Sequence, residues 1–381
     1  MGSQFFLGTE RHKHWAIACR ETYDGNQTHK DFTMATATVK ATAKATERQE
    51  SHERQALFPV VQNGLVGYIS REGKVIVAAQ FKRDEQDSFR VLSAVSVRGL
   101  ESGLCPVRVG DLWGYIDKKG KTAITPQFEQ AGAFGDGLAS VRLEGRWGYI
   151  DTSGEFAVNP RFEAAGIFID GRAAVKVDAG WGFIDSKGEF VVQPQFDDVG
   201  GSAWVTVQNT EQSHGHFSEK LAAVRIGDKW GYIDQSGTLV IKPQFEDAHS
   251  FFEGLAAVNL SGKWGFIGKD GDFAINPQFE AAAGFGDGRA PVCLNGLWGY
   301  VDTKGKFVDN PQFEDASSFF GQMAAVKFQG KWGYINLAGE YAITPRFDLA
   351  GNFTHELAPV CLEESWGYID KEGSYVWHPT K

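Results

Sequence analysis

The sequence has little of several features that mark particular classes of protein. Four cysteines in 381 residues are too few for the disulfide framework of a small secreted domain, and their spacing is not that of a metal site. No apolar run approaches the roughly 18 residues of a membrane-spanning helix. The N-terminus lacks the basic and apolar segments of a secretion signal. We therefore expect a cytoplasmic protein without a membrane span.

Positive charge is also in short supply. The chain has 38 lysines and arginines against 48 aspartates and glutamates, which gives a formal net charge of −10. A chain of this charge has no general attraction for DNA, RNA or anionic lipid. We therefore expect no nucleic-acid partner.

Glycine and tryptophan are abundant, at 46 and 11 residues, and they recur together. Trp-Gly pairs begin at Trp113, Trp147, Trp181, Trp230, Trp264, Trp298, Trp332 and Trp366. All but one of the intervals between them are 34 residues long, and Val66-Gly67 opens a ninth, degenerate copy. The intervals of 47 residues after Val66 and 49 after Trp181 each hold one repeat and an insertion, near residues 82–103 and 205–216. Repeat proteins place such insertions in surface loops on one face.

Each copy predicts three short strands, which we call A, B and C. In the fifth copy they span residues 221–226, 230–234 and 238–243. Strands A and C alternate between apolar and polar residues, as half-buried strands do. Strand B is apolar on both faces, so we expect it to be central, with its glycine allowing another backbone or an aromatic ring to approach closely. A left-handed glycine is expected in each turn between B and C: Gly73, Gly120, Gly154, Gly188, Gly237, Gly271, Gly305, Gly339 and Gly373.

Proline narrows the topology of the array. Pro59, Pro106, Pro291 and Pro359 lie within strand A, so this strand should be at a sheet edge or direct its missing N–H toward solvent. Whole units stand at both ends, from Leu57 to Pro379, and no half-unit is left to complete a blade begun elsewhere. The pattern therefore favours an all-β open solenoid or superhelix, with a closed β-propeller as the alternative.

The motif resembles a known repeat family. Lys-Trp-Gly-Tyr-Ile-Asp at 229–234, Gly237 and Pro-Gln-Phe-Glu at 243–246 are similar to the bacterial WG-repeat, or KWG-repeat, family. The resemblance covers roughly residues 56–381, and the first copy departs from it with Val66 for tryptophan and Ala79 for proline. It implies a tandem β-repeat module, often attached to other domains and usually without assigned biochemistry.

Residues 1–55 differ from the array. The segment 33–46 is low in complexity and lacks bulky apolar side chains, so it cannot bury enough surface to offset the entropy of ordering. We expect a flexible leader over residues 1–55, and Met34 is an alternative start.

Four sets of residues are candidates for binding or chemistry. The tryptophans could form a row that binds sugars or quaternary amines, but recurrence in nearly every copy favours a packing role. An aspartate before the turn glycine could bind calcium but more often caps a turn: Asp117, Asp151, Asp185, Asp234, Asp302 and Asp370. An acidic row follows strand C and a basic row lies in strand A: Glu129, Glu163, Asp197, Glu246, Glu280, Glu314 and Asp348, and Arg108, Arg142, Lys176, Arg225 and Lys327. These rows could be solvated faces or ion pairs between repeats, or a surface that steers a charged partner.

The remaining candidates are weak. The histidine pairs His12 with His14 and His214 with His216 have no carboxylate or thiol beside them, and Cys293 and Cys361 lie too far apart to bridge. The unrepeated residues form no Ser-His-Asp or Cys-His set and no phosphate-binding glycine loop. We therefore expect no catalytic, cofactor-binding or metal site and no enzyme.

Two functions of different classes remain. The first is a scaffold or accessory subunit that binds a partner protein along the repeated surface. The second is a carbohydrate or small-molecule binder that uses aromatic grooves between repeats. No polar cap follows Tyr375-Val376-Trp377, so the C-terminal end could be covered by a partner or, through self-association, by a second copy of the chain.

Overall fold

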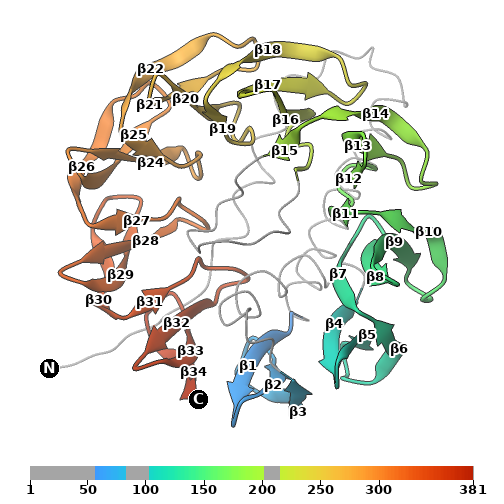
Figure 1. Ribbon diagram of the computed structural model, residues 1–381. Coiled ribbons are helices and arrows are strands. Elements are labelled where there is room, and N and C mark those ends of the chain that lie inside the picture. The colour runs from blue at the N-terminus through green and yellow to red at the C-terminus, as the bar shows by residue number, and fades with distance from the viewer. Residues whose placement is uncertain (1–55, 83–102, 201–214, 381) are drawn as a thin grey trace, which may run out of the picture. The chain divides into compact units, whose positions relative to one another are not determined.

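The computed structural model describes residues 56–82, 103–200 and 215–380, and these residues form nine small antiparallel sheets. Figure 1 shows the sheets arranged as the blades of a ring. The expectation of an all-β repeat is confirmed. The open solenoid is wrong, and the alternative, a closed nine-bladed propeller, is right.

The first two blades have three strands each within the described residues. Blade 1 consists of β1 (Phe58–Gln62), β2 (Leu65–Ile69) and β3 (Val75–Lys82), and blade 2 of β4 (Leu104–Val109), β5 (Leu112–Asp117) and β6 (Thr122–Phe128). In both blades the strands follow the predicted order A, B and C, with C at the rim.

Blades 3 to 9 have four strands each, because the segment before strand A forms a short inner strand. In order from inner strand to strand C they are β7 (Gln130–Gly135), β8 (Leu138–Leu143), β9 (Arg146–Asp151) and β10 (Phe156–Phe162); β11 (Ala164–Ala165), β12 (Ala173–Val177), β13 (Gly180–Ile184) and β14 (Phe190–Phe196); β15 (Asp198–Gly200), β16 (Leu221–Ile226), β17 (Lys229–Asp234) and β18 (Leu239–Phe245); β19 (Asp247–Ala248), β20 (Ala256–Leu260), β21 (Lys263–Ile267) and β22 (Phe273–Phe279); β23 (Ala281–Ala282), β24 (Arg289–Leu294), β25 (Leu297–Asp302) and β26 (Phe307–Phe313); β27 (Asp315–Ala316), β28 (Met323–Phe328), β29 (Lys331–Asn336) and β30 (Tyr341–Phe347); β31 (Leu349–Ala350), β32 (Ala358–Leu362), β33 (Ser365–Ile369) and β34 (Tyr375–Thr380).

The hydrophobic core lies between blades. Trp147 and Tyr149 on strand B of blade 3 pack with Val175 and Ile184 of blade 4, and Phe168 of blade 4 is buried among them. One face of strand B, with tryptophan and tyrosine, therefore covers the opposite face of the next blade, which carries glycine and isoleucine. Strand B is buried on both sides, as its sequence predicted.

The glycine after tryptophan makes room for the neighbouring strand. Between strands B and C of blade 3 the register shifts, so that Tyr149 pairs with Val158 and Trp147 with Phe162. A Cβ atom added at Gly148 would lie 2.6 Å from the carbonyl oxygen of Val158 and 2.7 Å from the nitrogen of Pro160. The predicted close approach of a backbone is confirmed, and the approaching backbone is the bulge of strand C at its proline.

The turn glycines are also as predicted. The glycine between strands B and C has a φ between 77° and 91° in every one of the nine blades. The missing Cβ at Gly154 also leaves room for Ile124 of the preceding blade, which would lie 3.2 Å away. One residue type thus serves both the left-handed turn and the contact between blades.

Strand A is not an edge strand in blades 3 to 9, which corrects the expectation drawn from proline. In blade 9 the carbonyl oxygen of Pro359 accepts the N–H of Gly351, the residue after the inner strand, at 2.8 Å. The carbonyl of Gly351 in turn accepts the hydroxyl of Tyr334 of blade 8, also at 2.8 Å. Because a tyrosine of the neighbouring blade supplies the donor, the ladder does not need an N–H at residue 359.

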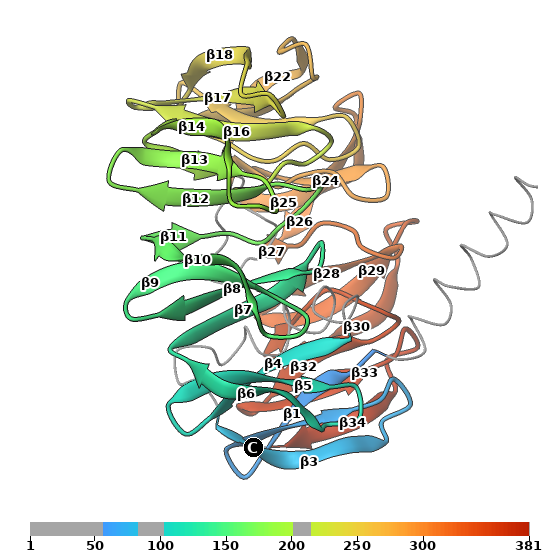
Figure 2. The same cartoon turned by 90° about the vertical axis from the view of Figure 1, so that its right-hand side faces the viewer.

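The ring closes without a shared sheet. Blade 9 contacts blade 1 through β1, β33 and β34, which lie side by side in both views (Figures 1 and 2). The Tyr368 hydroxyl donates to the carbonyl of Pro59 at 3.0 Å, and the Phe58 and Tyr368 rings meet edge to face at 5.5 Å. Between blades 8 and 9 the Tyr334 hydroxyl also crosses to the next blade, but it donates to the Gly351 carbonyl beside the inner strand. Complete units at both ends therefore close through contacts between blades, and no half-unit is needed.

This closure also covers the C-terminal strand. Val376 and Trp377 of β34 pack against the buried cluster that contains Phe58 and Val77 of blade 1. The reason for expecting self-association through this end is therefore removed.

Candidate functional site

The ring has two faces built from different turns. The linker face consists of the turns between strands A and B and the links from strand C to the next blade. The turn face consists of the turns between inner strand and strand A and those between strands B and C. Lys269 and Glu219 join the two kinds of turn on the turn face with an ion pair of 2.8 Å.

The tryptophans are packing residues. Trp147, Trp181, Trp332 and Trp366 are buried, and the tryptophans of the other four pairs are half-buried. Their rings pack against the next blade, so they do not form an exposed row for stacking on sugars. The packing interpretation of the Trp-Gly pairs is confirmed.

The aspartates before the turn glycine cap their own turns. Asp151 accepts the backbone N–H of Ser153 at 2.8 Å and that of Glu155 at 3.2 Å through Oδ1. Hydrogen bonds from the Ser153 side chain and then from backbone N–H groups lower the pKa of Asp151. Asp234 has the same bonds and a lowered pKa for the same reasons. These carboxylates stabilise turns, as the sequence predicted.

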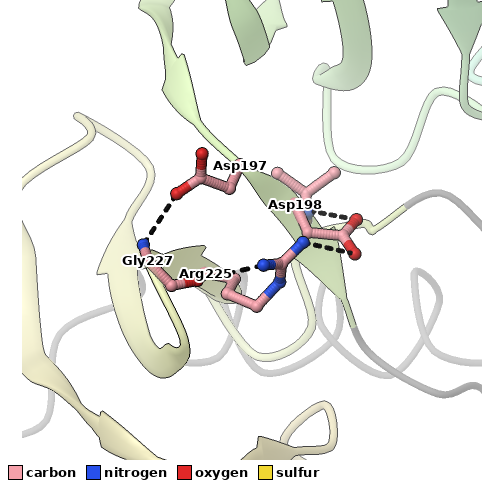
Figure 3. A network of polar contacts seen from close by, with 5 residues as sticks. Asp197, Asp198, Arg225 and Gly227 are labelled. Carbon is pink, nitrogen blue, oxygen red and sulfur yellow. Dashed lines mark hydrogen bonds and ion pairs between the residues drawn. The ribbon is translucent and has the colours of Figure 1, made fainter.

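The acidic row lies on the linker face and also caps turns. In blade 5 an Asp197 carboxylate oxygen accepts the Gly227 N–H at 2.7 Å, while Asp198 pairs with Arg225 at 3.5 Å (Figure 3). The Arg225 guanidinium also lies 5.9 Å from the centre of the Trp230 ring. Equivalent bonds to the turn between strands A and B come from Glu129, Glu246, Glu280, Glu314 and Asp348.

Some members of the acidic row also form ion pairs between blades. Arg146 of blade 3 lies 3.8 Å from Glu163 of blade 4, and Lys229 of blade 5 lies 3.7 Å from Glu246 of blade 6. The basic residue before tryptophan makes both pairs. The two charge rows of the linker face are thus largely neutralised and used by the fold, which favours the structural interpretation over a steering surface.

A second acidic row, on the turn face, was missed at the sequence level. We call Asp136, Asp170, Glu219, Glu253 and Asp287 the carboxylate ring. Each lies two or three residues before the first residue of strand A and has a φ between 48° and 53°. Four of them accept a backbone N–H from the turn of the next blade: Asp136 from Gly171, Glu219 from Gly254, Glu253 from Gly288 and Asp287 from Gln322. The sequence pattern that could have identified this ring is an acidic residue two positions after the buried phenylalanine of each repeat.

The repeat pattern breaks between blades 7 and 8. Arg289 and Asp309 form an ion pair of 3.1 Å, with side chains 19% and 9% exposed. At the position of Arg289 the other blades have an apolar residue, except for an arginine in blade 4. None of them has an acidic residue at the position of Asp309. Burial raises the pKa of Asp309, and the charge of Arg289 partly offsets this. On the turn beside this pair, Phe320 is 54% exposed and Gly321 replaces the acid of the carboxylate ring.

The histidine and insertion candidates lie mostly outside the described residues. That part includes His12, His14 and His214, residues 83–102 and 205–214 of the two predicted insertions, and the leader of residues 1–55. The chain on the two sides of residues 201–214 is joined by a hydrogen bond from the Gly215 N–H to the Val199 carbonyl at 3.2 Å. That insertion therefore leaves the sheet at the inner strand of blade 5.

The described cysteines are free and buried: Cys105, Cys293 and Cys361. Burial raises the pKa of Cys105 to about 12, although its hydrogen bond with Tyr68 acts in the opposite direction. Its thiol therefore remains protonated. Within residues 56–82, 103–200 and 215–380, no three His, Cys, Asp or Glu side chains group as a metal site requires. In the same part of the chain no helix is long and apolar enough to cross a membrane.

Comparison with known proteins was made by sequence and by fold. The family model described as WG containing repeat matches residues 113–147, 147–180, 181–202, 215–230, 230–264, 264–298, 298–332 and 332–364, more than half of the chain. No curated protein matches the sequence.

The fold is similar to a crystal structure of the eukaryotic initiation factor, with a TM-score of 0.58 and 10% identity over 85% of this chain and 96% of that one. At this identity the likeness concerns the fold alone. Hsv2p of Kluyveromyces lactis has a TM-score of 0.41 at 10% identity, over 64% of this chain and 94% of that one. Dihydro-heme d1 dehydrogenase NirN in complex with DHE has a TM-score of 0.43 at 13% identity, over 77% of this chain and 76% of that one. Neither of these two scores supports an argument.

Proposed function

The chain belongs to the WG-repeat family, and from this membership and the closed ring of its blades we propose that it is a non-catalytic scaffold that binds a partner protein. The observation that carries the proposal is the use of the repeated residues. Tryptophan, glycine, tyrosine and the turn aspartates all pack blades or close turns. What they hold in place is two broad faces made of turns, and such faces suit recognition of another macromolecule.

Two further parts of the proposal rest on the sequence. The low cysteine content supports a reducing compartment, and we place the protein in the cytoplasm on that ground. The family resemblance supports a bacterial source.

Co-purification tests the proposal directly. The tagged full chain, expressed at its natural level, should recover at least one protein in near-stoichiometric amount. That protein, purified separately, should form a complex of defined mass with the chain in size exclusion with light scattering. The free chain should run as a monomer, since its C-terminal strand is covered by blade 1.

The alternative, a carbohydrate or small-molecule binder, has its own readout. The half-buried tryptophans, such as Trp264 and Trp298, should change fluorescence if a ligand entered between blades. A saturable response to a member of a glycan array, with no protein recovered in stoichiometric amount, would favour this alternative and end the scaffold proposal.

A further inference from the structure

Phe320 has an exposure that packing does not explain. It is 54% exposed, the largest value among the big apolar side chains of the described residues. The neighbouring residue Phe319 is buried against Tyr300, with ring centres 4.9 Å apart, and fills the place that the repeat assigns to a phenylalanine. Among its counterparts, Gly135, Gly286, Ser218 and Thr354 add little apolar surface, and Ile169 and Phe252 are only partly exposed. Exposed aromatic side chains on a rigid turn are frequent anchors of protein interfaces.

The surroundings of Phe320 are acidic. Asp287 of blade 7 accepts the Gln322 N–H at 2.7 Å through Oδ2, which places its carboxylate two residues along the turn from Phe320. Oδ1 of Asp287 accepts no hydrogen bond from a described residue. Glu253 is the next member of the carboxylate ring, and it too has no ion pair with a described residue. Among the described residues, Glu219 is the one member of the ring with an ion-pair partner, Lys269.

One cation lies close to this turn and is already neutralised. The Lys371 ammonium is 3.8 Å from the Cβ position of Gly321, and it pairs with Glu356 at 3.2 Å. The carboxylates near Phe320 thus retain negative charge that a partner could neutralise.

The ion pair of Arg289 and Asp309 contacts blade 8 next to this turn. The Arg289 guanidinium lies 5.6 Å from the centre of the Phe319 ring, and Asp309 lies against Gly339 of blade 8. The aliphatic pairs of most other blades show that the blade contact does not require charges here, and such buried pairs are no more stabilising than apolar ones. Three departures from the repeat, at Arg289, Asp309 and Gly321, are therefore gathered at the same boundary between blades as the exposed ring of Phe320.

From these observations we propose that the turn face over blades 7 and 8 is a docking surface for a basic polypeptide segment, which places an apolar side chain against Phe320 and its positive charges near Asp287 and Glu253. This deepens the proposed scaffold function and rests on it. Charge complementarity identifies the segment as basic, and the exposed ring identifies its anchor as apolar.

Selection from a random peptide library on the immobilised full chain tests this surface. The enriched peptides should carry net positive charge and an apolar residue, and their binding should weaken as salt is raised. Measured by fluorescence anisotropy, Phe320→Ser should weaken binding about tenfold or more. Asp287→Asn keeps an acceptor for the Gln322 N–H but removes the charge, and it should weaken binding less and reduce the salt dependence.

Matched variants on the linker face control for general effects. Leu297→Ser removes another exposed apolar side chain, which is 40% exposed, and Glu314→Gln neutralises a carboxylate that caps a turn. Both should bind the peptides as the unmodified chain does, and all four variants should keep its circular dichroism spectrum.

Three results would overturn the docking surface: enriched peptides that are acidic, peptides that bind Phe320→Ser with unchanged affinity, or a library that yields no binder. The co-purification experiment separates this failure from failure of the scaffold function. A stoichiometric partner that binds Phe320→Ser normally would leave the scaffold in place and remove only this surface.

Discussion

At the scale of single residues, the glycine after tryptophan and the tyrosine after it have separate tasks. The glycine admits the bulge of strand C within its own blade, as at Gly265 beneath Ile275 and Pro277. The tyrosine hydroxyl reaches the next blade, as Tyr232 does at the carbonyl of His249, 2.7 Å away. The motif therefore combines one contact inside the blade with one contact between blades.

Gly265→Ala should destabilise the protein. The added Cβ would lie 2.6 Å from the Ile275 carbonyl and 2.7 Å from the Pro277 nitrogen, and backbone atoms can move only by distorting the sheet. We expect a loss of about 1–3 kcal/mol in urea unfolding. Gly262→Asn is the control, because residue 262 has a φ of 74° and open space, and asparagine tolerates that conformation. Equal losses in both variants would contradict the steric explanation.

The turn aspartates predict a loss of stability in acid. Hydrogen bonds from Ser236 lower the pKa of Asp234 from its ordinary value of 3.8. A carboxylate whose pKa is lower in the folded state contributes stability above its unfolded pKa and loses it as the pH falls through the folded pKa. At pH values below about 4 the melting temperature of the protein should therefore decrease. In Asp234→Asn this fall should be smaller, since Asn336 makes the same turn bonds in blade 8 without a charge. An unchanged acid profile would show that the turn carboxylate is not responsible.

The pair of Arg289 and Asp309 suits a double-mutant cycle. Arg289→Leu alone leaves a buried carboxylate without its partner and should cost about 3–5 kcal/mol. Arg289→Leu with Asp309→Ile restores the Leu255 and Ile275 combination of blade 6, and it should be neutral or more stable than the unmodified chain. If the double variant were as unstable as the single one, the pair would be needed for the contact between blades.

At the scale of elements, the sequence predicted strands A, B and C but not the inner strand. Strands A and C alternate and strand B is apolar throughout, so their patterns are long enough to recognise. The inner strand of blade 4 is Ala164–Ala165, and two small residues carry no periodicity. The carboxylate ring was missed for the same reason, since it lies in the turn that this unseen strand creates.

The inner strand explains a difference expected between two tyrosine variants. Tyr334→Phe removes the donor to the buried Gly351 carbonyl, and Pro359 has no N–H to replace it. Tyr149→Phe removes the donor to the Gly166 carbonyl, but Ala174 across the ladder has an N–H that can take over. We expect losses of about 1–3 kcal/mol for the first and about 1 kcal/mol for the second. Calorimetry that ranks them in the opposite order would contradict this account of the proline.

At the scale of the whole molecule, the choice between open array and ring was beyond the sequence. The sequence of each repeat indicates which residues pack on the neighbouring repeat, but it does not indicate the angle between successive blades. That angle depends on small differences of twist accumulated over nine units. Complete units at both ends indicate an open array only if closure needs a shared sheet. The hydrogen bond of Tyr368 to Pro59 and its ring contact with Phe58 close the ring without one.

The boundary between blades 9 and 1, which we call the seam, should be the first place where the ring opens. Phe58 is fully buried beside Tyr368, and Phe58→Ala should cost about 3–5 kcal/mol. Hydrogen exchange should show early loss of protection in blades 1 and 9, because no chain link holds them together there. Phe168→Ala removes an equivalent ring beside Tyr149, at a boundary that the chain does cross. This control should lose similar stability, with its faster exchange confined to blades 3 and 4. Uniform loss of protection in the Phe58 variant would argue against a separate seam.

Because the seam joins two complete sheets, the chain ends could lie at any other boundary between blades. A permuted gene that joined the present ends by a linker and cut the link between two other blades, such as the one at Glu246, would encode the same nine sheets and nine boundaries. Such a circular permutant should fold to the same ring, with the seam moved to the new cut. Selection or design could therefore place a fused domain beside any blade of this protein without altering the ring itself.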